Sequence, residues 1–109
     1  MRPKIQLTCD VPFGLVRING DLDLTADGYV TSIFETLEGC GVLEIQADLG
    51  GVTFIDAYAL GQLRRIQRHV AVTGGHLQVV AGSERYVRTC RLAQYDTLLP
   101  QGLTAPTRR

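Results

Sequence analysis

Asp56 is the residue of this chain whose position best suits a binding site. It follows a run of strand-forming residues and precedes a segment of helical periodicity, in which one face carries Leu60, Leu63, Ile66 and Val70. A carboxylate there accepts the free backbone N–H groups of the first helical turn, so Asp56 is predicted to be an N-cap. The same helix start suits an anion, a phosphate or a partner's carboxylate. A binding site and a simple cap both stay open.

Other groups that could perform catalysis lack a supporting pattern. Asp21 and Asp23 are close enough in sequence for acid–base or metal chemistry, but solvated loop carboxylates are the favoured interpretation. The sequence has no G-x-S-x-G, no Walker loop and no Cys–His arrangement, and its only serines, Ser32 and Ser83, stand in no nucleophile setting. The sequence therefore predicts that the protein is not an enzyme.

The cysteines and histidines do not form a metal-binding pattern. Cys9, Cys40 and Cys90 are far apart and odd in number, and neither His69 nor His76 stands at ligand spacing from any of them. We expect reduced cysteines buried as small apolar side chains, which is typical of a cytoplasmic protein. We expect neither a metal nor another cofactor.

Length and composition indicate one globular domain. The 109 residues are 45% apolar and 20% charged, which argues against disorder. Eleven basic and eleven acidic residues cancel, so no nucleic-acid partner is expected. The N-terminal residues lack the apolar core of a signal peptide, and no apolar run is long enough for direct membrane insertion. We expect a domain over residues 1–100 and a frayed tail over 101–109.

The periodicity of the apolar residues predicts an α/β fold. Alternation predicts an opening hairpin, and helical spacing predicts helices between the later strands. The expected strands lie near residues 4–9, 15–19, 42–49 and 77–81, with at most a short fifth at 98–99. The expected helices lie between Thr25, as an N-cap, and Gly39, over 57–72, and over 84–92 after the N-cap Ser83. Helices between strands require crossovers, so the later strands should be mainly parallel and the hairpin antiparallel.

Glycines set the expected strand ends. Gly20 should end the second strand, and Gly50 with Gly51 should break the third before the residues Val52 to Asp56. The polar face of the helix over 57–72 carries Gln62, Arg65, Arg68 and His69. That face is either solvated or, as a second interpretation, a basic patch for an acidic partner.

The run D-L-G-G-V-T-F-I-D-A-Y-A-L-G-Q-L, from Asp48 to Leu63, resembles the signature loop of STAS domains, the family of the bacterial anti-sigma-factor antagonists. That family has the pattern D-L-x-x-V-x-F-x-D-S-S-G-L. The segments G-D-L-D from Gly20 and G-G-H-L from Gly74 resemble its G-E-L-D and G-G-x-L. These pieces stand in the family's order from about Lys4 to Pro100. The resemblance implies a mixed sheet of four to five strands with its helices mainly on one face.

The sequence departs from the family at the position that controls its members. The residue after the signature Asp is usually a Ser or Thr that a partner kinase phosphorylates, and here it is Ala57. The next position, usually Ser or Thr, is Tyr58, and the usual Gly is Ala59. The resemblance therefore implies a degenerate phosphosite at Ala57. A further departure is Gln94, where the family usually has the glycine that ends the last of these helices.

The resemblance implies a regulatory protein–protein interaction module in transcription signalling. Family members dock the signature loop and the following helix start onto an anti-sigma factor that is also a serine kinase of the histidine-kinase-like ATPase type. The residues expected to bind such a partner are Asp23, Asp56, Ala57, Tyr58, Ala59, Gln62 and Arg65. Without a hydroxyl at position 57, we expect constitutive binding. An accessory subunit of a lipid-transport ABC system or of a stressosome-like assembly is the alternative, and a homodimer stays open.

Overall fold

The computed structural model of the chain describes residues 3–23 and 27–100, apart from the side chains of Asp27 and Tyr29. Two predictions, the N-cap at Thr25 and the tail over 101–109, lie outside these residues.

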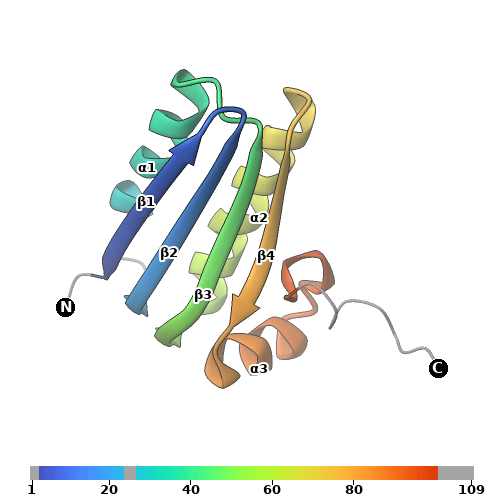
Figure 1. Cartoon of the computed structure of the whole chain (residues 1–109). Coiled ribbons are helices and arrows are strands. Elements are labelled where there is room, and N and C mark those ends of the chain that lie inside the picture. Colours follow the sequence, from blue (N-terminus) through green and yellow to red (C-terminus); the bar gives the residue numbers. More distant parts are fainter. Residues whose placement is uncertain (1–2, 24–26, 101–109) are drawn as a thin grey trace.

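A four-stranded mixed sheet is the centre of the fold (Figure 1). The strands lie side by side in chain order, and their bounds are Lys4–Asp10 for β1, Phe13–Leu22 for β2, Glu44–Ile55 for β3 and His76–Gly82 for β4. The first two form the predicted antiparallel hairpin, and β2, β3 and β4 are parallel. The α/β fold class and the mixed sheet are therefore confirmed.

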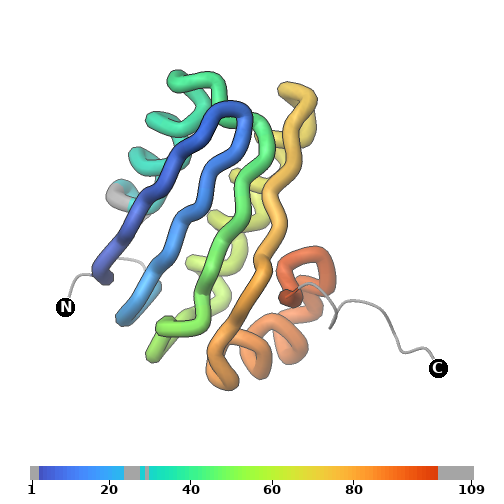
Figure 2. The backbone as a smooth tube through the Cα atoms, in the orientation of Figure 1, coloured from blue at the N-terminus to red at the C-terminus, as the bar shows by residue number. Residues whose placement is uncertain are grey.

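In the part of the chain that the structure describes, three α-helices connect or follow the strands. Their bounds are Asp27–Gly39 for α1, Ala57–Val72 for α2 and Glu84–Leu92 for α3, and a 3₁₀ helix, η2, spans Asp96–Leu98. The first two helices lie side by side on one face of the sheet, as the crossovers require (Figure 1). Near the end of β4, α3 and η2 pack beside α2 (Figure 2).

Most of the core lies in the layer between the helices and the sheet. In β3 the residues Ile45, Ala47 and Leu49 are buried, and the intervening Gln46 is exposed, as strand periodicity predicts. On α2 the apolar stripe faces this layer: Leu60, Leu63 and Val70 are buried and Ile66 is half-buried. The helical face predicted from the sequence is thus confirmed.

The prediction that glycines end the second and third strands is wrong. The second strand, β2, continues past Gly20 to Leu22, and β3 continues through Gly50 and Gly51 to Ile55. Gly51 pairs with Asn19, and the Asn19 side chain occupies the space that a Cβ at Gly51 would need. The β2–β3 register also shifts at this point. Glycine therefore marks a close approach inside the strand and does not break it.

The suggested fifth strand at residues 98–99 is also wrong, and the sheet of the described residues has four strands. Leu98 belongs to η2, and both Leu98 and Leu99 are buried in the core. The Leu98 carbonyl accepts a hydrogen bond of 2.7 Å from the buried Tyr86 hydroxyl of α3. This segment thus completes the core beside α3 and does not extend the sheet.

The prediction of buried cysteines holds only for Cys90. Cys9 and Cys40 are exposed, and all three thiols are free. Cys9 lies on the edge strand β1, and Cys40 lies in the turn after α1, where no neighbouring element covers it. Burial raises the pKa of the Cys90 thiol, which keeps it in the unreactive protonated form.

Gln94 occupies the position that ends α3 in a left-handed conformation, with φ of 62°. Its N–H donates to the Arg91 carbonyl at 3.2 Å, and the Tyr95 N–H donates to the Cys90 carbonyl at 2.9 Å. This pair of bonds is the Schellman motif, in which glycine is preferred because it has no Cβ.

We expect the substitution Gln94→Gly to raise the free energy of unfolding by about 0.5–1 kcal/mol, because it relieves the left-handed strain at an exposed side chain. Urea unfolding of both proteins measures the difference. As a control, Gln94→Ala keeps the Cβ and should give no such gain. Equal stability of the glycine and alanine variants would contradict the role assigned to the backbone.

Candidate functional site

The start of α2 is built around Asp56, which is its N-cap. Asp56 has an extended backbone, with φ of −110° and ψ of 171°. Its Oδ1 accepts the Ala59 N–H at 2.8 Å, and its carbonyl accepts the Leu60 N–H at 3.1 Å. The predicted cap is thus confirmed, and it holds the first turn of α2 in a defined conformation.

The first turn of α2 displays two side chains to solvent and buries the third. Ala57 is exposed, and Tyr58 is 43% exposed. Tyr58 is therefore not part of the core, and part of its side chain reaches solvent. Ala59, by contrast, is buried among core residues, so the structure places it beneath the surface on which partner contact was expected.

Three elements form a small apolar depression next to this turn. Its lining comes from the end of β2, from α1 and from α2. Leu22, Val30, Ala59 and Leu63 are buried there, whereas Asp23 and Gln62 are half-buried and Tyr58 is exposed. We call Asp23, Ala57, Tyr58, Gln62 and Arg65 the α2-start surface. The structure thus brings Asp23, Tyr58 and Gln62 together around one depression, although Asp23 precedes Tyr58 by 35 positions in the sequence.

Arg65 joins this surface through Gln62. Its Nη1 donates to Gln62 Oε1 at 3.1 Å, one helical turn from the depression. Both side chains reach solvent, so this hydrogen bond orients polar groups at the rim and contributes little to stability.

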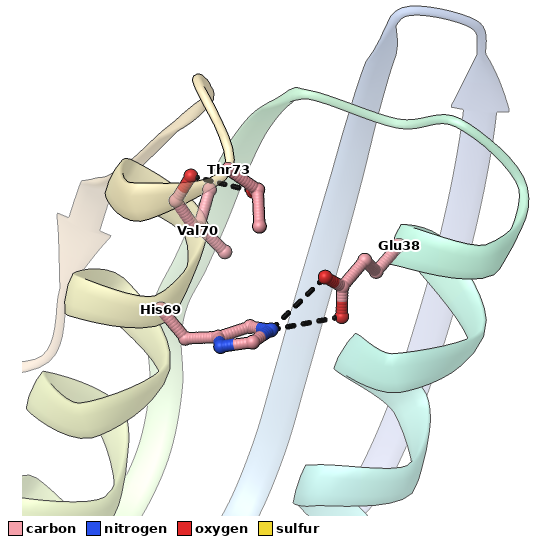
Figure 3. Close-up of polar contacts among 4 residues, drawn as sticks. All are labelled: Glu38, His69, Val70 and Thr73. Carbon is pink, nitrogen blue, oxygen red and sulfur yellow. Dashed lines mark hydrogen bonds and ion pairs between the residues drawn. The ribbon is translucent and has the colours of Figure 1, made fainter.

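His69, at the other end of α2, belongs to a separate contact. Its Nε2 lies 2.9 Å from Glu38 Oε2 at the end of α1 (Figure 3). Nearby, the Thr73 hydroxyl donates to the Val70 carbonyl at 2.8 Å and closes the last turn of α2 (Figure 3). His69 therefore links the ends of α1 and α2 and lies apart from the depression at the start of α2.

Two features of this end of the sheet were missed by the sequence analysis. Thr53 and Asp21, on neighbouring strands, are joined by a hydrogen bond of 2.7 Å from the threonine hydroxyl to the carboxylate. Phe54 is exposed although it lies in a strand-forming run. Strict alternation through Val52 fails there, because buried Ile55 follows two exposed residues. Phe54, two residues before Asp56, is thus a candidate contact for a partner. In the sequence, the only sign of its exposure is that Phe54 and Ile55 are adjacent apolar residues, which break the alternation.

The hydroxyl groups of Ser83 and Tyr86 both have structural roles around α3. Ser83 Oγ accepts the Tyr86 N–H at 3.1 Å and caps α3, as predicted. Burial raises the pKa of the Tyr86 phenol far above its usual range, so it stays a hydrogen-bond donor to Leu98.

Within residues 3–23 and 27–100, no group of three His, Cys, Asp or Glu side chains could hold a metal ion. In the same part of the chain, every helix is too short or too polar to cross a membrane.

Comparison with known proteins identifies one family and several similar folds. The sequence of residues 4–108 matches the STAS domain family. No curated protein matches the chain. The unphosphorylated form of the anti-sigma factor antagonist SpoIIAA is 17% identical, with a TM-score of 0.72, and the match covers 84% of this chain and 81% of that one.

Two further structures are similar. A putative anti-sigma factor antagonist from Thermotoga maritima is 20% identical, with a TM-score of 0.76, over 88% of this chain and 83% of that one. An anti-sigma factor antagonist from Mycobacterium paratuberculosis is 16% identical, with a TM-score of 0.77, over 92% and 87%. At these identities the likeness to solved structures shows the fold alone.

Proposed function

The chain belongs to the STAS domain family, and from that premise we propose that it is a regulatory protein–protein interaction module that acts as an anti-sigma-factor antagonist. Solved structures with this fold include anti-sigma factor antagonists that cover most of this chain, which supports the proposal. The partner is an anti-sigma factor that is also a serine kinase of the histidine-kinase-like ATPase type.

The observation that carries this proposal is the α2-start surface. An apolar depression with a polar rim has the composition of a protein-binding patch, in which the centre loses water and the rim stays solvated. Tyr58 supplies a large ring with a polar tip at that rim, which is typical of an interface anchor. Asp56 keeps the turn that carries Tyr58 rigid, so little conformational entropy is lost on binding.

Family members with a serine or threonine after the signature Asp are controlled by phosphorylation of that residue, and this surface is controlled differently. Ala57 has no hydroxyl and cannot accept phosphate. The nearby Thr53 lies inside β3 and donates its hydroxyl to Asp21, which leaves it in a strand and not at the helix start. The Tyr58 oxygen stands at the far end of a phenol ring, too far from the backbone for a kinase site shaped to a serine. The protein therefore binds its partner constitutively. The abundance of the protein, or a competitor for the partner, then determines how much sigma factor is released.

We expect Ala57→Ser to create a phosphorylation site. Serine is well tolerated at a helix start, and Ala57 is exposed, so the fold should not change. Incubation with the partner kinase and ATP should leave residue 57 of the wild type unmodified and phosphorylate the variant. The added charge of about −1.5 to −2 should then release the partner. Mass spectrometry locates the phosphate, and a binding assay before and after ATP measures the release.

Ala71→Ser is the matched control, because it makes the same change at an exposed position near the other end of α2. This variant should gain no phosphate and keep its affinity in the presence of ATP. Stoichiometric phosphate on wild-type Thr53 or Tyr58, together with loss of the partner, would refute constitutive binding.

The proposed function itself is tested by displacement. Purified wild-type protein should release the sigma factor from its complex with the anti-sigma factor encoded beside its gene. If the wild type fails to do so, and instead copurifies with a transport ATPase and its permease, the accessory-subunit alternative replaces this proposal.

A further inference from the structure

Strand β1 forms an open edge of the sheet. It is the outermost strand next to β2, and it is antiparallel to it along all seven residues (Figure 2). Six of these residues are exposed and Ile5 is half-buried. Leu7, in the middle of the strand, is 39% exposed. Such an edge presents unpaired backbone N–H and C=O groups that can pair with another strand.

The usual protections of an edge strand are weak here. Proline and β-bulges disrupt edge pairing, but β1 contains no proline and its register with β2 is regular from Lys4 to Asp10. Its only lysine, Lys4, stands at the end of the strand. The edge is therefore free of bulges and seven residues long, and it can form a regular ladder.

The sequence of β1, K-I-Q-L-T-C-D, is complementary to itself when two copies run antiparallel. With Leu7 opposite Leu7, the apolar Ile5 lies opposite Cys9 and the polar Gln6 lies opposite Thr8. At the ends of the ladder, Lys4 of one copy lies opposite Asp10 of the other. Neither of these charged side chains forms an ion pair with a residue that the structure describes.

This pairing also keeps each side chain on its present face. Ile5 pairs with Ile18 of β2 and Leu7 pairs with Val16, so both lie on the face of the sheet that carries the helices. In a direct antiparallel pair, opposed residues share a face, so the apolar residues of the two copies would meet on the helix side. The charged pairs would meet on the other side of the sheet.

We propose that β1 is a dimerisation edge, on which a second copy of this chain pairs antiparallel about a two-fold axis at Leu7. Two four-stranded sheets then join into one sheet of eight strands. The contact is isologous, as two-fold symmetry requires. None of the residues of the α2-start surface lies on β1, so the dimer presents two such surfaces.

Charge reversal tests this register without altering the core. The single variants Lys4→Asp and Asp10→Lys each place like charges opposite one another at both ends of the ladder. Each should weaken self-association by about tenfold or more, measured by sedimentation velocity. A mixture of the two variants should form heterodimers, because every pair of opposed charges is then complementary. The double variant Lys4→Asp, Asp10→Lys should dimerise like the wild type.

The wild type should be dimeric, and its affinity should fall at high salt because the end pairs are exposed. Circular dichroism of each single variant should match the wild type, which separates lost pairing from lost folding. Leu7→Lys gives an independent check, since it places two like charges on the axis. A wild type that stays monomeric at about 1 mM would overturn the proposal. So would a dimer that both single reversals leave unchanged.

Discussion

Replacing Leu63 with alanine is expected to lower the free energy of unfolding by about 2–5 kcal/mol. Leu63 is 2% exposed and lies on the face of α2 that packs against the sheet. The substitution removes buried apolar surface and leaves a cavity that the close-packed layer between α2 and the sheet can only partly close. Urea unfolding followed by circular dichroism measures the change, with the m-value checking that the transition stays two-state.

Val72→Ala is the control for this prediction, because Val72 is on the same helix and is 85% exposed. It should change the stability by no more than about 0.5 kcal/mol. Similar losses for the two substitutions would mean that α2 does not present its Leu63 face to the core. Leu63 also lines the floor of the depression, so its variant is unsuitable for testing partner binding.

The second large effect is expected in partner binding. Tyr58→Ala should weaken binding of the anti-sigma factor by about 2 kcal/mol or more, which is about thirtyfold in Kd. The ring lies at the rim of the depression and would lose most of its exposure on docking. Tyr58→Phe keeps the ring and should retain most of the affinity. Calorimetric titration of each variant with the partner measures these differences.

Phe13→Ala is the matched control for the tyrosine. Phe13 is an exposed aromatic at the first residue of β2, whereas Asp23 follows the last residue of the same strand, so the two lie at opposite ends of the sheet. This variant should bind as tightly as the wild type. If Phe13→Ala loses affinity and Tyr58→Ala does not, the partner docks at the other end and the α2-start surface is not the site.

Local structure was largely determined by the sequence itself. The cap at Asp56, the cap at Ser83 and the apolar stripe of α2 all follow from residues within a few positions of one another. Capping and helical periodicity depend on backbone groups that are near in sequence, so their pattern can be read directly. The end of α3 was not determined in this way, because Gln94 stands where the family usually has glycine, and only the structure shows that Gln94 itself adopts the left-handed conformation.

The tertiary structure decided what depends on contacts between distant segments. The extension of β3 through Gly51 rests on its pairing with Asn19 of the neighbouring strand, and the path of Leu98 rests on a hydrogen bond from Tyr86. The exposure of Cys9 follows from the place of its strand at the edge of the sheet.

The α2-start surface shows both contributions. Ala57 and Tyr58 are placed by the cap beside them, which the sequence indicates. The sequence, through the family resemblance, also led us to expect Asp23 near this loop, but only the packed sheet and helices show it lining one depression with Tyr58 and Gln62. Side chains far apart in the chain meet only after strand register and helix packing are set, because burial of the shared apolar layer determines which elements lie together.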